Sequence, residues 1–337
     1  MPKTIRNEYD KYLTFENLMR AHQKSRKGKN YRDNIIKFNL KQEEYIMYLY
    51  NELKNLTYKH GNYREFYVKE PKLRKIEASK YIDRVVHTWY VESFLKNTFM
   101  KQFLPTSYAC VEGKGMHRAA LDVQKGMRKC KSKYGNYYIL KMDIAKFFPS
   151  INKDVLFNIM KKKIKDKKVL WLTKEIIYSK KDSEGIPIGN YTSQIFANIY
   201  LNEIDQYIKN ILKVKFYYRY MDDSIILVEH KSEAKEILEK IKRYLEENLK
   251  LKLNSKTNIF KSTQGVNFCG YKINEYRLKI RSKGKKKLKN KIKYLKKQIK
   301  LKQLSSKEAQ KYLCGHYGYI KYANCYNLVN KLFEVEN

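Results

Sequence analysis

The sequence has few of the residues that cross-link or interrupt a chain. It has 5 cysteines in 337 residues and no C-x-x-C pair, which argues against a disulfide framework and against zinc. No run approaches the roughly 18 apolar residues of a membrane span, and the first residues lack the apolar segment of a signal peptide. We therefore expect a cytoplasmic protein. Because there are only 5 prolines and 13 glycines, each of them is an informative turn signal.

Positive charge dominates the composition. The chain carries 73 lysine and arginine residues against 34 aspartate and glutamate residues, a formal net charge of +39. This excess favours a polyanionic partner, first nucleic acid and second an anionic membrane surface, although a lysine-rich surface without a specific partner gives the same count. The 31 tyrosines and 14 phenylalanines supply rings that stack on bases while cations hold phosphates. Composition therefore favours a nucleic-acid-binding protein.

Hydrophobic periodicity predicts both helices and strands. Helical spacing is found over residues 10–55, 153–164, 168–179, 192–211 and 232–249. Alternating apolar residues predict strands on both sides of Pro71 and over 137–143, 214–221, 224–229, 251–260 and 266–273. The predicted fold class is α+β.

The C-terminal region, after about residue 280, has a separate character. Its lysine-rich sequence carries a narrow apolar seam of Leu288, Ile292, Leu295 and Ile299 at helical spacing. Such a helix contacts a duplex backbone, pairs with another helix or exposes a solvated face. The charge of the whole chain favours the first of these. Further on, His316 is interpreted as a surface or core histidine and not as a ligand.

Two strand-rich segments end in carboxylates. The run "YYILKMD" ends at Asp143, and "FYYRYMDDSIILVE" places Asp222 and Asp223 between two strand-like runs. Neighbours on a regular strand point to opposite faces, so these two aspartates serve one site only if they lie at a hairpin turn. An aspartate pair in a turn is weak evidence alone, because aspartate is a common turn former. A third carboxylate at a strand end strengthens the case.

Carboxylates held close together raise one another's pKa unless a cation neutralises them. Mg²⁺ is a suitable cation, because it takes oxygen ligands and needs few protein carboxylates when phosphates supply the others. Two metal ions about 3.5 to 4 Å apart need several anchoring oxygens, which Asp143, Asp222 and Asp223 would supply. We therefore predict two Mg²⁺ ions, with Mn²⁺ as a substitute.

Five ordered segments resemble the consecutive palm motifs of reverse transcriptases: "YILKMDIAKFFPSI", "GIPIGNYTSQIFANIYL", "YYRYMDDSIIL" (the YMDD motif), "LKLNSKTNIF" and "VNFCGYKI". Upstream, "PKLRKIEASKYIDRVVH" and "SYACVEGKGMHRA" resemble the fingers motifs of bacterial reverse transcriptases. The pattern is most similar to the enzymes of diversity-generating retroelements, which carry an aliphatic residue before the motif glycine and then Ser-Gln. Here these residues are Ile188, Gly189, Ser193 and Gln194. Phage-defence and group II intron enzymes share much of it.

The resemblance implies a catalytic set. Asp143, Asp222 and Asp223 would bind the metal ions that activate a primer 3′-hydroxyl and hold the triphosphate. Lys256 matches a lysine proposed to protonate the leaving pyrophosphate. Phe148 matches the ring that crowds the sugar 2′ position and selects deoxynucleotides, unless it is a core phenylalanine like Phe147.

The resemblance also implies substrate contacts. Lys72 and Arg74 match residues that grip the incoming triphosphate, although Lys72 is equally well a generic surface charge. Ile188, Gly189 and Gln194 would lie beside the nascent base pair, and Gly189 would let the backbone approach it. Ile188 replaces the glutamine of many retroviral-type enzymes, so we expect weaker base discrimination. Phe268, Cys269, Gly270 and Tyr271 correspond to the primer grip, a turn that positions the primer end.

The implied architecture is a right hand with fingers, palm and helical thumb. We expect fingers over residues 1–135, a palm of antiparallel sheet backed by helices over 136–275, in which 153–190 is partly a fingers-like insertion, and a thumb over 276–337. The implied partners are an RNA template, an RNA–DNA duplex, dNTPs, a dedicated non-coding RNA and a basic accessory protein, with no membrane partner.

The implied function is RNA-directed DNA synthesis, in a low-fidelity diversity-generating retroelement or, alternatively, in phage defence on a dedicated non-coding RNA. An RNA-templated RNA polymerase or a terminal transferase would share the same site. A non-catalytic RNA-binding or splicing cofactor is the alternative from another class. It is disfavoured because the three carboxylates and the ring at Phe148 are all present.

Overall fold

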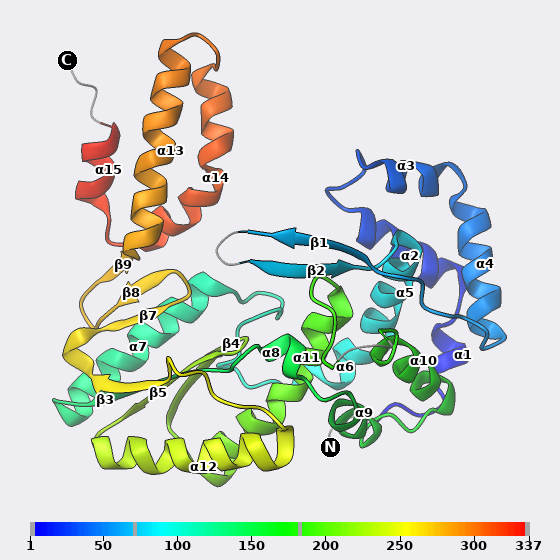
Figure 1. The fold of residues 1–337 in the computed structure, drawn as a ribbon, viewed down its shortest axis with the longest axis horizontal. Helices are drawn as coiled ribbons and strands as arrows, with labels where there is room; N and C mark the ends of the chain where they lie inside the picture. The colour runs from blue at the N-terminus through cyan, green and yellow to red at the C-terminus, as the bar shows by residue number, and fades with distance from the viewer. Residues whose placement is uncertain (1–3, 70–72, 181–183, 334–337) are drawn as a thin grey trace. The chain divides into compact units, whose positions relative to one another are not determined.

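Helices and antiparallel strands form the chain in Figure 1, a computed structural model that describes residues 4–69, 73–180 and 184–333. The predicted α+β class is confirmed. The chain divides into two compact units, each assembled from separate stretches: Met1–Leu104, Ile144–Tyr207 and Lys242–Lys252 in the first, and Pro105–Asp143, Ile208–Ile241 and Leu253–Asn337 in the second. Within the described ranges, no helix has the length and apolar character to cross a membrane.

The first unit is mostly helical. Its helices are α1 (Tyr9–Tyr12), α2 (Phe15–Arg26), α3 (Asp33–Leu40), α4 (Gln42–Lys54), α5 (Tyr81–Tyr90), α6 (Lys96–Thr98), α8 (Phe147–Ser150), α9 (Lys153–Lys161), α10 (Lys167–Ile177) and α11 (Tyr191–Gln206). A π-helical turn, Val91–Leu95, joins α5 to α6, and another, Tyr207–Ile211, follows α11. The helices predicted in these regions are present, with ends that differ by a few residues.

One two-stranded antiparallel sheet belongs to this unit. Strand β1 (Arg64–Val68) pairs with β2 (Arg74–Ala78), and Val68 lies opposite Arg74. The strands predicted on both sides of Pro71 are therefore confirmed. The turn itself, with Pro71 and Lys72, lies outside the described residues. Strand β1 is exposed along its whole length, whereas β2 becomes buried toward its end.

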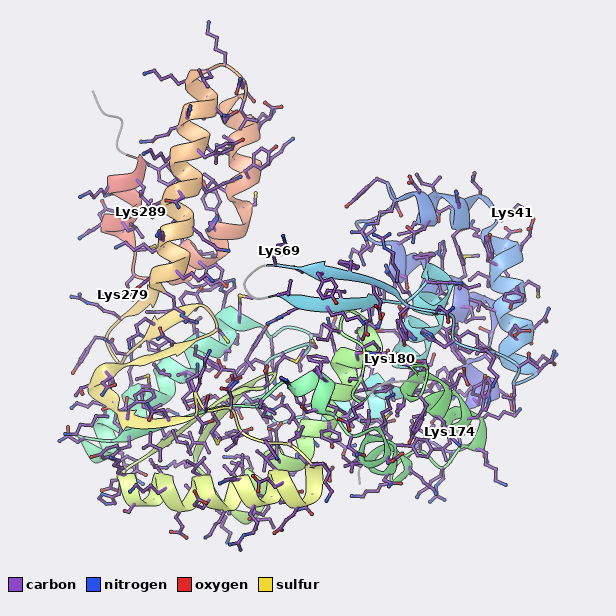
Figure 2. The ribbon with its side chains drawn as sticks, viewed as in Figure 1. Lys41, Lys69, Lys174, Lys180, Lys279 and Lys289 are labelled. Carbon is purple, nitrogen blue, oxygen red and sulfur yellow. The ribbon has the colours of Figure 1, made fainter. Side chains whose placement is uncertain are left out.

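Lysine side chains project from elements of both units, as the labelled residues in Figure 2 show: Lys41, Lys69, Lys174 and Lys180 in the first unit, and Lys279 and Lys289 in the second. The net charge of +39 is therefore spread along the chain. Spread charge of one sign attracts a polyanion without defining where it binds, so a specific site needs further evidence.

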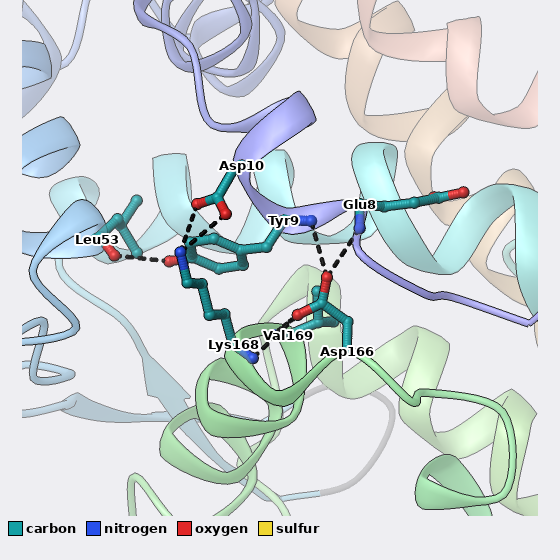
Figure 3. Close-up of polar contacts among 7 residues, drawn as sticks. All are labelled: Glu8, Tyr9, Asp10, Leu53, Asp166, Lys168 and Val169. Atoms are coloured by element: carbon teal, nitrogen blue, oxygen red, sulfur yellow. Dashed lines mark hydrogen bonds and ion pairs between the residues drawn. The ribbon is translucent and has the colours of Figure 1, made fainter.

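A buried carboxylate ties the N-terminal segment to α10 (Figure 3). Asp166 is 5% exposed, and its Oδ2 accepts hydrogen bonds from the backbone N–H groups of Glu8 (2.8 Å) and Tyr9 (3.0 Å). Its Oδ1 caps α10 by accepting from the N–H groups of Lys168 and Val169. One side chain therefore satisfies donors at the starts of two helices, which otherwise lack partners.

A four-stranded antiparallel sheet forms the centre of the second unit. Its order is β4 (Phe216–Tyr220), β5 (Asp223–Val228), β3 (Tyr138–Asp143) and β6 (Asn258–Lys261). Helix α12 (Lys231–Leu249) follows β5 in the chain. The segment predicted as one strand over 251–260 contributes only β6, because residues 250–257 are mostly irregular, with an isolated bridge residue at Leu253 and a turn at Ser255 and Lys256.

Helix α7 (Met116–Tyr134) covers one face of this sheet. Its buried residues pack in a single cluster with alternate residues of the strands, among them Ile139, Tyr218 and Ile225. Because side chains alternate along a strand, residues two apart share a face. Lys141 and Asp143 therefore follow Ile139 on the face that α7 covers. Helix α7 is not among the elements predicted from the sequence.

A second, three-stranded sheet follows in the chain: β7 (Val266–Phe268), β8 (Tyr271–Ile273) and β9 (Leu278–Ile280). The strand-like segment over 266–273 forms two strands, because the chain reverses at Cys269 and Gly270, with φ angles of 49° and 85°. The turn that the resemblance implies over Phe268–Tyr271 is therefore present. Strand β9 was not predicted, since only its pairing with β8 makes it a strand.

The C-terminal helices are α13 (Ser282–Lys300), α14 (Ser306–Tyr322) and α15 (Tyr326–Phe333). The seam predicted on α13 is confirmed: Leu288, Ile292 and Leu295 are buried against Ala309 and Leu313 of α14, and Ile299 packs at its margin. The seam is therefore used within the chain, and the lysines of α13 stay on its outer face. His316 lies half-buried on α14.

Candidate active site

The aspartate pair lies at a tight hairpin. Tyr220 and Asp223 are partners at the ends of β4 and β5, so Met221 and Asp222 alone form the turn. Met221 has a φ of 52°, in the left-handed region that residues other than glycine seldom adopt. The predicted hairpin is confirmed. Asp223 belongs to the first position of β5, whereas Asp222 is held by the turn.

Asp143 lies directly opposite Asp223 in the antiparallel pair of β3 and β5. Directly paired residues point to the same face of a sheet, with Cβ atoms about 4.5 to 5.5 Å apart. Two strand ends therefore bring two carboxylates together on the face that carries Lys141. The third predicted carboxylate, Asp222, is the next residue along the turn.

Lys141 is a functional candidate that the sequence analysis missed. Its Nζ lies 3.1 Å from Asp223 Oδ2 and donates a hydrogen bond to the carbonyl oxygen of Asn267 at 2.8 Å. It therefore links the carboxylate edge to β7. A usable signal was present in "LKMD", because a lysine two residues before Asp143 in a strand must share its face.

Burial makes the Asp223 carboxylate unusual. Loss of solvent raises its pKa from 3.8 to about 6, the charge of Lys141 opposes this rise, and the charges of Asp143 and Asp222 add to it. Its Oδ1 is buried and has no hydrogen-bond partner among the residues that the structure describes. A buried acceptor without a donor is costly, and a bound cation would remove that cost.

The side chains of Asp143 and Asp223 are chemically suited to bind a divalent cation. Paired carboxylate oxygens, one of them without a partner, are hard ligands of the kind that Mg²⁺ takes. In the part of the chain that the structure describes, however, no three His, Cys, Asp or Glu side chains are arranged to hold a metal ion. Asp143 and Asp223 would be the first ligands, and ions bound there would need substrate oxygens to complete their coordination.

The pKa of Asp223 gives a stability prediction. Well below pH 3.8 this side chain is neutral in both states, so an asparagine there changes little. As pH rises from about 3 to 6, the carboxyl ionises first in the unfolded chain and wild-type stability falls. At pH 8 the free energy of unfolding of Asp223→Asn should therefore exceed that of wild type by about 1 to 2 kcal/mol, after allowance for the 31% of the side chain that solvent reaches.

Chemical denaturation from pH 4 to pH 8 measures this difference, with the exposed Asp10→Asn as a matched control. Equal stabilities of wild type and Asp223→Asn at pH 8 would contradict this account of the carboxylate.

The loop before β6 approaches Asp143 through the backbone. Asn254 donates its N–H to the Asp143 carbonyl oxygen at 2.7 Å, and Thr257 Oγ1 accepts from the Asp143 N–H at 3.4 Å. Lys256 lies between these two residues and is exposed. The structure therefore brings the predicted general acid into the loop that holds Asp143, and its catalytic role stays a prediction.

The predicted primer-grip residues form the β7–β8 hairpin. Phe268 and Tyr271 are buried partners, and Cys269 and Gly270 form the turn between them. Burial and the charge of Asp223 raise the pKa of the Cys269 thiol, so this turn lies near the carboxylates. A Cβ atom at Gly270 would lie 2.6 Å from the Tyr319 ring, which explains the glycine.

The predicted nucleotide residues belong to the first unit. The backbone N–H of Ile186 donates to the Phe148 carbonyl oxygen at 3.1 Å, and that of Glu77 in β2 donates to the Ile188 carbonyl oxygen at 2.9 Å. The loop over 184–190 thus joins α8 to β2, whose first residue is the exposed Arg74. Sequence reasoning missed the buried Asn190, whose side-chain oxygen accepts from Ser79.

Phe148, Gly189 and Gln194 differ in their surroundings. Phe148 is half-buried, whereas Phe147 is 3% exposed and belongs to the core. Gly189 has a φ of 119°, and a Cβ atom there would lie 2.8 Å from Ile76 Cγ2. The glycine is therefore required by the close approach of β2. Gln194 is exposed on α11.

Comparison with known proteins agrees with this geometry. Residues 67–273, more than half of the chain, match the family model described as reverse transcriptase (RNA-dependent DNA polymerase). The chain is 24% identical over 243 residues to protein YkfC of Escherichia coli, covering 60% of this chain and 63% of that protein.

Two relatives come from retroelements. The group II intron-encoded protein LtrA of Lactococcus lactis subsp. cremoris is 25% identical over 226 residues, covering 60% of this chain and 36% of that protein. The retron Ec73 reverse transcriptase of Escherichia coli is 32% identical over 125 residues, covering 33% and 39%. The chain thus spans less than two thirds of the length of each of these relatives.

Proposed function

This chain belongs to the reverse transcriptase family, and from that premise we propose that it is an RNA-directed DNA polymerase that adds dNTPs to a primer 3′ end. The observation that carries the proposal is the opposition of Asp143 and Asp223 across β3 and β5, beside a turn that holds Asp222. The buried, unpartnered Oδ1 of Asp223 supports a cation-binding role for this edge.

The residues of the chain would act by position and charge. Asp143 and Asp223 would hold two Mg²⁺ ions, with Asp222 as the third carboxylate. When bound there, the ions would activate the primer hydroxyl and neutralise the triphosphate. Lys141 would keep Asp223 ionised near neutral pH, because its positive charge opposes the effect of burial. The β7–β8 turn would place the primer end, and Lys256 would give a proton to pyrophosphate.

The nucleotide would be held by residues of the first unit. Arg74 and Lys72 would bind the triphosphate, and Ile188, Gly189 and Gln194 would lie along the base pair. The ring of Phe148, which is half-buried, would exclude a ribose 2′-hydroxyl. Fingers, palm and thumb would follow the predicted boundaries near residues 135 and 275.

Primer extension on an RNA template tests the function and the role of Phe148 together. Wild type should extend with dNTPs, and Phe148→Ala should raise the use of rNTPs relative to dNTPs by roughly tenfold or more, because removal of the ring opens space at the 2′ position. Phe157→Ala, a change of another half-buried ring in the same unit, is the control. Absence of extension by wild type on any template would refute the function, and unchanged sugar selectivity would refute the role of Phe148.

For the biological setting we propose a diversity-generating retroelement in the cytoplasm, on the basis of Ile188, Gly189, Ser193 and Gln194. Its partners would be a dedicated non-coding RNA and a basic accessory protein. Sequencing of DNA copied from a defined RNA distinguishes this setting from phage defence. Errors concentrated at template adenines favour diversification, whereas errors without base preference favour the defence enzyme.

A further inference from the structure

The C-terminal end of helix α14 packs against two other elements of the second unit. The backbone N–H of Asn324, just beyond α14, donates to the Leu278 carbonyl oxygen of β9 at 2.7 Å, and its side-chain oxygen accepts from the Leu278 N–H at 2.8 Å. The same end of the helix meets the start of α7 and the β7–β8 turn (Figure 1). This end of α14 is therefore fixed to the sheet that contains the predicted primer grip.

Four side-chain rings meet at this end of α14 and form what we call the ring junction: His117 of α7, Tyr271 of β8, and Tyr319 and Tyr322 of α14. The Nδ1 of His117 and the hydroxyl oxygen of Tyr271 form a hydrogen bond of 2.7 Å. The His117 ring stacks on Tyr322 with the ring centres 5.0 Å apart, and it meets Tyr319 edge to face at 5.3 Å. Burial lowers the pKa of His117, so its neutral form dominates at pH 7 and makes these contacts without a buried charge.

Two glycines allow the ring junction to pack this closely. A Cβ atom at Gly318 of α14 would lie 2.9 Å from His117 Nε2, and one at Gly270 in the β7–β8 turn would lie 2.6 Å from the Tyr319 ring. A glycine inside a helix weakens that helix, and here the close approach of His117 explains why position 318 carries one. The side chain of Tyr319 therefore touches the turn on one side and His117 on the other.

The β7–β8 hairpin connects the ring junction to the carboxylate edge. Lys141, which pairs with Asp223, also donates a hydrogen bond to the Asn267 carbonyl oxygen of β7. The Cys269 thiol of the turn lies close enough to Asp223 for the charge of that carboxylate to raise the thiol pKa. A displacement of the turn would therefore move groups beside the carboxylates. A shift of about 1 Å in a reacting group can cost about a hundredfold in rate, so a small displacement is enough to matter.

We propose that His117 is a positioning residue for the primer end: through Tyr271 and Tyr319 it holds α14 against the β7–β8 turn and so keeps that turn aligned with the carboxylate edge. The inference rests on the proposed function, because the turn places a primer only in a polymerase. His117 itself touches neither substrate nor metal ion and moves no proton. Its loss should therefore slow primer extension without abolishing it.

Alkylation of Cys269 by iodoacetamide, located by mass spectrometry of peptides, tests the hold on the turn without any substrate. In wild type this thiol is half-buried beside Tyr319 and its pKa is raised, so it should react slowly. In His117→Ala it should react roughly tenfold faster, because the turn opens more often. The exposed Cys314 of α14 is the internal reference and should react equally in both proteins. An unchanged rate at Cys269 would overturn the inference, whatever the outcome for polymerase activity.

Single-turnover primer extension separates positioning from primer binding. His117→Ala should lower the rate at saturating dNTP roughly tenfold and change the dissociation constant of the primer–template less than twofold. Tyr271→Phe removes only the hydroxyl group and should also slow extension. The double variant His117→Ala/Tyr271→Phe should be no slower than His117→Ala, because both changes break the same hydrogen bond. His117→Asn keeps a hydrogen-bonding group near the place of Nδ1 and should recover most of the rate.

The matched control is His316→Ala, which removes a half-buried histidine of the same helix from outside the ring junction. It should keep the wild-type extension rate and the wild-type alkylation of Cys269. If His117→Ala does not fold, Tyr271→Phe carries both measurements, because it breaks the hydrogen bond and keeps the ring. Equal losses in His117→Ala and His316→Ala, or a wild-type rate in His117→Ala, would refute the inference alone. Absence of extension by wild type would instead refute the proposed function.

Discussion

Primer extension should fall roughly a thousandfold when Asp143 or Asp223 is replaced by asparagine, a loss of about 4 kcal/mol of transition-state stabilisation. The reason is geometric. The two carboxylates are direct partners across β3 and β5, so each substitution removes one side of the same anionic edge. Single-turnover extension of a labelled primer on an RNA template at saturating dNTP measures the effect.

Two controls separate chemistry from folding in this experiment. Asp10→Asn removes an exposed carboxylate that pairs with Lys168, and it should keep the wild-type rate. Asp223→Asn should be at least as stable as wild type at pH 8, so its loss of activity would not reflect unfolding. If Asp143→Asn or Asp223→Asn extended the primer at a rate within threefold of wild type, the catalytic role of these carboxylates would be contradicted. That result would favour a non-catalytic RNA-binding role.

Lys141→Met should shift the pH dependence of primer extension. Lys141 opposes the effect of burial on Asp223, so its removal should raise the pKa of that carboxyl above about 6. At pH 7 a smaller fraction of the enzyme would then carry the ionised carboxylate. We expect roughly tenfold slower extension at pH 7, with recovery toward the wild-type rate at pH 9.

The pH profile of kcat/KM for a single dNTP measures this shift, and Lys141→Arg should retain the wild-type midpoint because it keeps the positive charge. The loss of the hydrogen bond to Asn267 alone would slow extension equally at every pH. An unchanged midpoint in Lys141→Met would therefore show that this lysine supports β7 and does not control Asp223.

The carboxylate hairpin could be predicted because its signals are local. Strand-forming residues flank "MDD" on both sides, and only a turn lets adjacent aspartates serve one site. The structure confirms the turn and adds the register that places Asp143 opposite Asp223. That register depends on pairing between strands about 80 residues apart in the chain. The order of the motifs suggests that these strands pair, but the pattern of apolar residues within each strand does not fix which residues lie opposite one another.

Elements that depend on tertiary pairing could not be predicted. Strand β9 lies at the edge of a lysine-rich segment and exists through its pairing with β8. The resemblance implies the β7–β8 turn, but the left-handed conformation of Cys269 in that turn has only the neighbouring glycine as a signal in the sequence.

The central claim is that the edge formed by Asp143, Asp222 and Asp223 binds two divalent ions in the presence of substrate. Electron paramagnetic resonance of Mn²⁺, titrated into the chain with primer, RNA template and a non-hydrolysable dNTP, counts these ions directly. The account predicts two bound Mn²⁺ per wild-type chain and fewer than one in the Asp143→Asn/Asp223→Asn double variant. Two tightly bound ions in that double variant would contradict it.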